Sequence, residues 1–207
     1  MFGKSYFEKI FQKGTPWGYS SSRYEKVKYT RQIEIMKRFI PEAQKILEIG
    51  CAEGAHTAMI AQAYPNAHIL CLDIAPTAVE KARRNCQQYR NIEIIEADII
   101  ELFKQQYFDP ESFNIVVQSE SIYMLFPRLV STLTLYSYFR NMKEIMNPRG
   151  IFITTNGMKG LTRLVMPVCY TILNQLYECV HESKFHEWND YRNEFWNYDL
   201  KVFQRTG

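Results

Sequence analysis

The feature of this sequence that most constrains its fold is a regular alternation of short apolar segments with helical segments between residues 45 and 155. An apolar segment of strand length, followed by a helix and then by another such segment, is typical of parallel strands joined by crossover helices. Continuous apolar runs such as Ile115-Val116-Val117 indicate strands buried on both faces. We therefore predict an α/β fold, with strands at 45–49, 68–72, 92–95, 113–117 and 151–155 and helices at 56–64, 76–89 and 129–146.

The two ends of the chain do not follow this rhythm. Helices are predicted at 5–11 and 23–39, separated by a segment rich in turn-forming residues, and Pro41 ends the second helix. Beyond residue 155 we predict a helix at 161–179 and two strands within 185–204. We therefore divide the chain into an N-terminal helical appendage, residues 1–40, and one domain, residues 41–207.

Charge and cysteine content narrow the classes of function. The net charge is +3 and no block of like charges occurs, which argues against a nucleic-acid partner. The five cysteines are odd in number and form no CxxC pair, so reduced thiols, a cytoplasmic protein and no metal site are expected. Charged or proline residues interrupt the apolar runs near 122–139 and 161–173, so no membrane span is predicted.

A glycine loop follows the first strand, and its residues indicate the type of ligand. The segment reads Glu48-Ile49-Gly50-Cys51-Ala52-Glu53-Gly54 and leads directly into a helix. Glycines allow a sharp turn and a close approach of ligand to main chain. A dinucleotide site has the spacing G-x-G-x-x-G and places a pyrophosphate at the helix N-terminus, where Glu48 and Glu53 would be unfavourable. A ligand with an ammonium group would instead use Glu48.

Two further acids close the next two strands. Asp73, followed by Ile74, ends the second strand, and its carboxylate can accept both hydroxyls of a ribose. Asp98, followed by Ile99, ends the third and can accept a hydrogen bond from the exocyclic amine of a base. Because ligands of parallel sheets bind at the carboxyl ends of the strands, these groups form a cradle for an amino-acid tail, a ribose and an adenine. That ligand is S-adenosylmethionine.

The pattern from about residue 45 to 155 resembles that of the class I, Rossmann-like methyltransferases. Residues 46–54 look like their first motif, Asp73 like their ribose acid, and residues 96–99 like their adenine-binding turn. Ala52 stands where the family usually has glycine. The resemblance implies a seven-stranded, mostly parallel sheet with helices on both faces, and S-adenosylmethionine as cofactor. It implies cofactor-binding roles for Trp17, Glu48, Gly50, Ala52, Gly54, Asp73, Ile74, Asp98, Ile99 and Gln118.

The segment after the fourth strand, residues 118–125, is where class I enzymes place groups that contact the methyl acceptor. It lacks the (D/N)PPY motif of DNA-amino methyltransferases and resembles the S-E-x-x-Y-Y-L segment of the NodS-type N-methyltransferases. The segment from Pro16 to Tyr29 looks like the P-W-x-x-x-x-S-x-Y-E-x-x-K-Y pattern of that group. NodS methylates the free amine of a deacetylated chitooligosaccharide. The resemblance suggests Glu120 as the group that orients the amine and accepts its proton, with Tyr123 assisting.

The sequence thus predicts methyl transfer from S-adenosylmethionine to a small molecule, possible acceptors including the amine of an amino sugar. O-methylation of a small metabolite, methylation of RNA or protein, and a catalytically silent partner subunit that binds S-adenosylmethionine remain open alternatives. Residues Trp17, Tyr19, Arg23, Tyr24 and Tyr29 are expected to form a lid over the cofactor. His56 is expected on the surface of the helix that follows the glycine loop.

Overall fold

A computed structural model describes residues 3–14, 18–125 and 131–206 of the chain. Seven strands form one sheet in the order β3-β2-β1-β4-β5-β7-β6. Strands β1 to β5 pair in parallel, whereas β7 runs antiparallel to both β5 and β6. The predicted seven-stranded, mostly parallel sheet is confirmed. The strands are β1 (Lys45–Ile49), β2 (His68–Asp73), β3 (Ile92–Glu96), β4 (Phe113–Val117), β5 (Met146–Gly157), β6 (Glu178–Asn189) and β7 (Glu194–Gln204).

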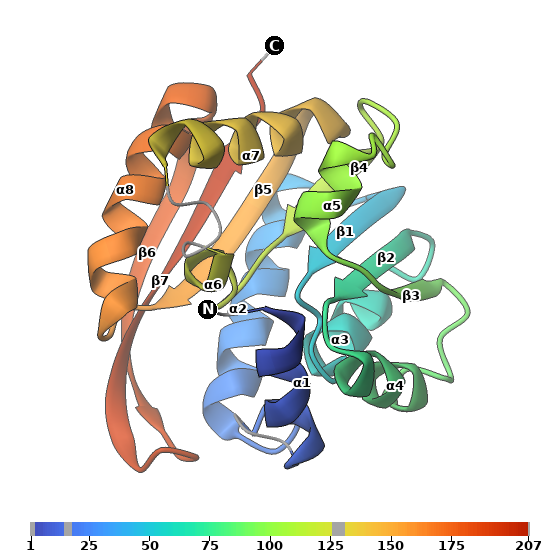
Figure 1. Cartoon of the computed structure of the whole chain (residues 1–207), viewed down its shortest axis with the longest axis vertical. Coiled ribbons are helices and arrows are strands. Elements are labelled where there is room, and N and C mark those ends of the chain that lie inside the picture. The colour runs from blue at the N-terminus through green and yellow to red at the C-terminus, as the bar shows by residue number, and fades with distance from the viewer. Residues whose placement is uncertain (1–2, 15–17, 126–130, 207) are drawn as a thin grey trace.

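Helices cover both faces of the sheet (Figure 1). On one face, α2, α3 and α4 pack over a cluster that includes Ile46; on the other, α5, α7 and α8 pack over a cluster that includes its neighbour Leu47. Because successive side chains of a strand point to opposite faces, burial on both faces requires the continuous apolar runs seen in the sequence. The helices are α1 (Lys4–Gln12), α2 (Arg23–Phe39), α3 (Ala55–Ala63), α4 (Pro76–Asn85), α5 (Ile99–Lys104), α6 (Ile122–Leu125), α7 (Thr132–Ile145) and α8 (Leu161–Leu176).

The differences from the predicted elements lie mainly in the C-terminal half. The predicted helix at 129–146 begins at Thr132 within the described residues, and the predicted fifth strand is extended in both directions. The helix predicted at 161–179 ends at Leu176, and β6 then begins at Glu178. The start of β6 was not predicted because this strand lies at the sheet edge and lacks a continuous apolar run. Its exposed residues alternate with half-buried ones. The short helices α5 and α6 were not predicted.

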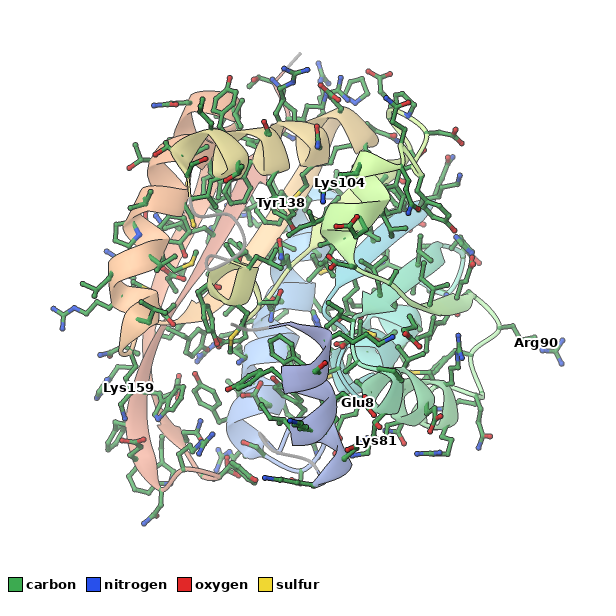
Figure 2. The ribbon with its side chains drawn as sticks, viewed as in Figure 1. Glu8, Lys81, Arg90, Lys104, Tyr138 and Lys159 are labelled. Atoms are coloured by element: carbon green, nitrogen blue, oxygen red, sulfur yellow. The ribbon has the colours of Figure 1, made fainter. Side chains whose placement is uncertain are left out.

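Helix α1 packs at the end of the sheet where β1 to β4 terminate (Figure 1). Helix α1 lies against α4, where the Glu8 carboxylate accepts hydrogen bonds from the backbone N–H of Thr77 at 2.9 Å and from its hydroxyl at 2.5 Å. Lys81 of α4 donates in turn to the carbonyl oxygens of Phe11 and Gly14 (Figure 2). These contacts hold α1 over the carboxyl ends of the strands.

Candidate active site

A cavity opens at the carboxyl ends of β1, β2, β3 and β4, where the sequence placed its candidate residues. Its walls come from α1, from the loop after β1, from the ends of β2 and β3, from the segment after β4 and from the β6–β7 hairpin. Of the residues predicted to bind cofactor, the cavity brings together seven, namely Gly50, Ala52, Asp73, Ile74, Asp98, Ile99 and Gln118. The two predicted acceptor-side residues, Glu120 and Tyr123, line the same cavity.

The glycine loop is tied to the second strand by its own backbone. The N–H groups of Gly50 and Cys51 both donate to the carbonyl oxygen of Leu72, at 2.8 and 3.0 Å. Gly50 has a φ of 81°, and a Cβ at this position would lie 3.2 Å from Ser121. Ala52, the departure from the usual glycine, adopts a φ of 49°. A chain carrying side chains at these positions adopts this loop only with strain.

Gly54, also predicted to bind cofactor, lies in contact with α4. It also has a φ of 81°, but it does not line either described cavity. A Cβ here would lie 2.9 Å from the Cys86 sulfur and 3.1 Å from the Ala82 Cα. The absence of a side chain at Gly54 therefore allows the N-terminus of α3 to pack closely against α4. This contact fixes the end of the glycine loop.

Asp73 is the carboxylate best placed to bind a ribose. It is buried and lines the cavity, and its two oxygens accept hydrogen bonds from the backbone N–H groups of Ala52 and Ala75, each at 2.9 Å. Burial raises the pKa of Asp73 above its ordinary value, and the N–H donors oppose that rise. Each oxygen retains a lone pair for a ligand hydroxyl.

The ends of β3 and β4 add two further polar groups. Asp98 caps α5, accepting from the N–H of Ile100 at 3.0 Å, and lines the cavity with Ile99. Gln118 is fully buried, and its Oε1 accepts from the Tyr138 hydroxyl at 2.9 Å. Its Nε2 has no hydrogen-bond partner among the described residues, although the side chain lines the cavity. A buried donor without a partner is costly, so this amide is suited to a ligand.

Glu48 is buried beside the cavity and does not line its larger part. Its carboxylate lies 3.0 Å from Nδ1 of His56 and accepts from the Thr57 hydroxyl at 2.5 Å. It lines a smaller adjoining cavity together with Gly50, Ala52 and Glu120. The expected surface position of His56 is wrong: the imidazole is buried and stacks on Tyr29, with ring centroids 4.6 Å apart. The Glu48 carboxylate draws His56 inward, a contact that helical periodicity does not reveal.

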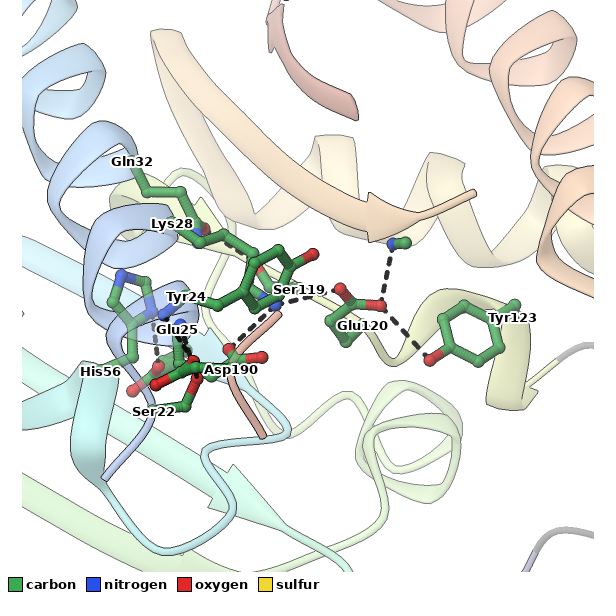
Figure 3. Close-up of polar contacts among 12 residues, drawn as sticks. Ser22, Tyr24, Glu25, Lys28, Gln32, His56, Ser119, Glu120, Tyr123 and Asp190 are labelled. Carbon is green, nitrogen blue, oxygen red and sulfur yellow. Dashed lines mark hydrogen bonds and ion pairs between the residues drawn. The ribbon is translucent and has the colours of Figure 1, made fainter. Parts of the chain in front are cut away.

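Glu120, predicted to contact the acceptor, lines the cavity and is held by three donors (Figure 3). Its Oε1 accepts from the Lys28 ammonium at 3.0 Å, and its Oε2 accepts from the N–H of Gly157 at 3.0 Å and from the Tyr123 hydroxyl at 3.3 Å. The backbone of Glu120 has a φ of 55°. Burial, followed by the Glu120 charge, raises the pKa of Tyr123 well above its ordinary value, so its hydroxyl stays protonated.

Charged residues of α2 and three residues of the β6–β7 hairpin belong to the site although they were not predicted there. Lys28 lies between Glu120 and Glu25, 2.9 Å from the latter, and Glu25 lines the cavity. Asn189, Arg192 and Trp196 of the hairpin form another part of the wall. The aromatic density of the C-terminal segment was the available signal, but edge-strand packing explained it equally well.

The hairpin turn and the start of α2 are joined by one carboxylate. Asp190 accepts from the Ser22 hydroxyl at 2.5 Å and from the backbone N–H groups of Arg23 and Tyr24 at 2.8 and 3.1 Å. These donors, the Ser22 hydroxyl first, lower the pKa of Asp190 to about 2. The contact places Glu25 and Lys28 in the cavity wall, because both lie on the first two turns of α2.

The N-terminal segment predicted to cover the cofactor contributes Phe7, Phe11 and Tyr19 to the cavity wall. Trp17 lies outside the described residues. Tyr24 and Tyr29 are buried on α2, where their ring centroids lie 5.1 and 5.9 Å from the Lys28 ammonium.

These residues fit S-adenosylmethionine. Asp73 offers carboxylate oxygens for ribose hydroxyls, Gln118 offers an unpartnered amide, and the Gly50 backbone allows close approach of a ligand. Within the described ranges, no group of three or more His, Cys, Asp or Glu side chains is arranged to hold a metal ion. In the same ranges, no helix combines the length and the apolar character needed to cross a bilayer.

Comparison with known proteins matches residues 40–205 to a family described as "Methyltransferase domain". Nodulation protein S of Bradyrhizobium diazoefficiens is 26% identical over 133 residues, covering 64% of this chain and 58% of that protein. Malonyl-acyl-carrier-protein O-methyltransferase of Anoxybacillus flavithermus is 32% identical over 108 residues, covering 50% of this chain and 40% of that protein. The chain therefore spans less than two thirds of either relative.

Among solved structures, the N-methyltransferase NodS from Bradyrhizobium japonicum WM9, in complex with S-adenosyl-L-homocysteine, matches with a TM-score of 0.77. The alignment covers 99% of this chain and 98% of that one, at 19% sequence identity. At this level of identity the likeness shows a shared fold.

Proposed function

Because the chain belongs to the methyltransferase domain family, we propose that its cavity transfers a methyl group from S-adenosylmethionine to the amine of a small molecule. The fold and the family confirm the predicted relation to class I methyltransferases that use S-adenosylmethionine, near the NodS type. The amine, and an amino sugar as its carrier, are our proposal. The observation that supports it is a cavity wall that carries two further carboxylates, Glu25 and Glu120, besides Asp73 and Asp98.

The proposed cofactor residues hold the two halves of the donor. Asp73 would bind the ribose, and Asp98 with Ile74 and Ile99 would surround the adenine. Gly50, Ala52 and Gln118 would contact the amino-acid portion or the sugar, with Glu48 close behind the glycine loop. When bound, S-adenosylmethionine would supply a methyl group on a sulfonium. The neutral thioether would leave as the acceptor nitrogen bonds to the methyl carbon.

The proposed role of Glu120 is to orient the acceptor, which binds as an ammonium, and to take the proton that its nitrogen must lose before the nitrogen lone pair can form the new N–C bond. The Lys28 ammonium holds Oε1 of this carboxylate, and the Gly157 N–H and the Tyr123 hydroxyl hold Oε2, so Oε1 is the oxygen that keeps a lone pair for the acceptor. Tyr123 would assist through its hydroxyl. Positioning of this kind can contribute about 7–11 kcal/mol to a displacement reaction.

We further propose that residues 1–40 close over the bound cofactor, and that residues 41–207 form the catalytic domain. Phe7, Phe11 and Tyr19 support this, because all three line the cavity from segments outside the family match. Limited proteolysis tests it. Slower cleavage within the first 40 residues when S-adenosyl-L-homocysteine is present is the expected result, and equal cleavage with and without it would remove the lid.

The test of the acceptor is a methylation assay with trideuteromethyl S-adenosylmethionine. The acceptors are glucosamine oligomers, their N-acetylated counterparts as matched controls, and a malonyl thioester. We expect label on nitrogen of the free-amine compounds and none on the acetylated ones, as read by mass spectrometry with fragment analysis. Label on oxygen would establish the O-methyltransferase alternative. Cofactor binding without turnover on any acceptor would favour a silent partner subunit.

The O-methylation alternative is supported by the malonyl-acyl-carrier-protein O-methyltransferase relative, whose substrate is named as a carboxylic acid derivative. The cavity argues against an acidic acceptor here, since Glu25 and Glu120 would repel it.

A further inference from the structure

Glu25, Lys28 and Glu120 form one charged unit in the acceptor wall. The Lys28 ammonium lies 2.9 Å from Glu25 and 3.0 Å from Glu120, and its side chain is 1% exposed. Lys28 and Glu25 come from α2, while Glu120 follows β4, 92 residues later in the chain than Lys28. The pairs therefore join an N-terminal helix to the segment where the acceptor is proposed to bind (Figure 3).

The unit carries one net negative charge, because one ammonium lies between two carboxylates. Burial alone would lower the pKa of Lys28, but Glu120 and Glu25 raise it well above its ordinary value, so the ammonium keeps its proton. A buried excess charge is unfavourable unless a partner of opposite sign compensates it. Both carboxylates line the cavity, so a compensating cation can reach them from that side.

The surroundings also suit a cation. Tyr19 and Tyr123 line the cavity beside the two carboxylates, and burial raises the pKa of each hydroxyl, so both remain neutral. Aromatic faces attract cations, and an ammonium can donate to a carboxylate at the same time. Asp199, buried on β7, adds negative charge near Glu120. Arg192 is the other cationic side chain of this cavity wall, and it is exposed on the hairpin turn, where solvent screens it.

From this arrangement the geometry points to an ammonium-binding subsite formed by Glu25 and Glu120, with Lys28 as the residue that positions both carboxylates and sets their net charge to minus one. The inference rests on the proposed function, since the cation it receives is the acceptor amine in its protonated form. It adds Glu25 as a binding residue and Lys28 as a positioning residue. Both lie outside the family match at residues 40–205.

A pair of cofactor analogues tests the subsite without any acceptor. Sinefungin carries a protonated amine where S-adenosylmethionine carries its methyl sulfonium, whereas S-adenosyl-L-homocysteine carries an uncharged sulfur. The ratio of their affinities, measured by calorimetry, shows how strongly the protein favours a positive charge at the position of the methyl sulfonium. We expect the wild type to bind sinefungin more tightly by about tenfold, as the field of one nearby charge in a partly screened cavity predicts.

Three variants distinguish charge from structure. Glu25→Gln and Glu120→Gln each leave the unit neutral, so each is expected to reduce the ratio by about tenfold. The double variant Lys28→Met with Glu25→Gln removes one charge of each sign and restores the net charge of minus one, so it is expected to recover most of the ratio. Glu182 lies on β6, does not line the cavity and pairs with Lys201 of β7, so Glu182→Gln is the matched control and should leave the ratio unchanged.

The affinity for S-adenosyl-L-homocysteine itself shows that each variant retains a folded cofactor site. An unchanged ratio in Glu25→Gln and Glu120→Gln would overturn the subsite. A ratio that falls in Glu25→Gln and stays low in the double variant would also overturn it, because net charge would then not be the cause. Ratios that follow net charge in a protein that methylates no amine would refute the proposed function while supporting the ammonium subsite.

Discussion

The cofactor side of the cavity comes from one continuous stretch of chain, whereas the acceptor side is assembled from three distant ones. On the cofactor side, the Ala52 N–H that binds Asp73 is 21 residues from it in sequence. On the acceptor side, Lys28 and Glu120 are 92 residues apart, and Ser22 and Asp190 are 168 residues apart. The first kind of site is encoded by strand ends and a glycine loop, and the second only by tertiary packing. The comparison therefore predicts that substitutions on the two sides affect different steps.

The largest effect restricted to one side is expected from Glu120→Gln. The substitution keeps the shape but removes the charge that meets the amine, so kcat should fall by about tenfold to a hundredfold. Affinity for S-adenosyl-L-homocysteine should stay within about twofold, since the separate strand ends hold the cofactor. Turnover with the amine acceptor and calorimetry check the two parts. Full turnover would remove Glu120 from the mechanism, and lost cofactor binding would break the division into two sides.

Tyr123→Phe should reduce kcat less than Glu120→Gln does, because the hydrogen bond of Tyr123 to Glu120 is long at 3.3 Å.

On the cofactor side, Gly50→Ala should weaken S-adenosyl-L-homocysteine binding by about tenfold, because a side chain is strained at positive φ and displaces the loop. The added Cβ would lie 3.2 Å from Ser121 at a φ of 81°. Gly160→Ala is the control, since its φ is 56° but nothing lies within 4 Å of the added atom. Calorimetry should show normal affinity in the control. Equal weakening in both variants would mean that backbone strain in general, and not this loop, limits binding.

Asp190→Ala removes the contact between the hairpin turn and the start of α2, and so changes the acceptor side alone. Loss of the carboxylate at the start of α2 should lower the free energy of unfolding by about 1 kcal/mol, the typical value of a helix cap. The folded-state pKa of Asp190 is about 2, below its ordinary value of 3.8. Its stabilising effect is therefore present above pH 4 and is lost as pH falls from 4 toward 2.

Denaturant titrations of wild type and Asp190→Ala at several pH values measure this. The difference between their unfolding free energies should be largest near neutral pH and should shrink below pH 3. A difference that is independent of pH would show that the ionised carboxylate is not what joins the hairpin to α2.

An effect of opposite pH dependence is expected from a buried acid behind the acceptor wall. Asp199 is 2% exposed, and burial raises its pKa to about 6, although the Tyr170 hydroxyl donates to it at 2.7 Å. Because the folded-state pKa lies above the ordinary 3.8, the contribution of Asp199 to wild-type stability is most favourable below pH 4 and becomes less favourable as pH rises to 6.

Asp199→Asn removes this dependence, so the variant should gain about 1–2 kcal/mol relative to wild type between pH 4 and pH 7. Denaturant titrations at the two pH values give the difference directly, and groups common to both proteins cancel. Parallel stability curves would show that Asp199 titrates normally.

The sequence predicts the features that depend on local signals and fails where distant segments pack together. Strand β4 and helix α2 were predicted with their observed limits, and Asp73, Asp98 and Gln118 lie together as the strand order requires. These predictions depend on periodicity and on strand ends, which are local properties. A loop glycine can serve a ligand or a close packing contact, and at Gly54 the structure shows a close contact of α3 with α4 that the sequence did not reveal.

The acceptor wall was only partly predicted. Glu120 and Tyr123 could be identified because they directly follow a strand. Glu25, Lys28, Asp190 and Trp196 could not, because a charged residue on an amphipathic helix and an aromatic residue on an edge strand have ordinary structural explanations. The packing of α2 against the C-terminal hairpin, held by Asp190, places Glu25 and Trp196 in the wall of one cavity, with Lys28 beside Glu25.

The central claim is that the carboxyl ends of β1, β2 and β3 bind S-adenosylmethionine through Asp73, and calorimetric titration tests it most directly. S-adenosylmethionine and S-adenosyl-L-homocysteine would be titrated into wild type, Asp73→Ala and, as a variant of the same shape, Asp73→Asn. We predict dissociation constants of about micromolar for the wild type, weakened by at least about a hundredfold in Asp73→Ala, as loss of two charged hydrogen bonds implies. Equal affinity in wild type and both variants, or no binding by the wild type, would contradict the account.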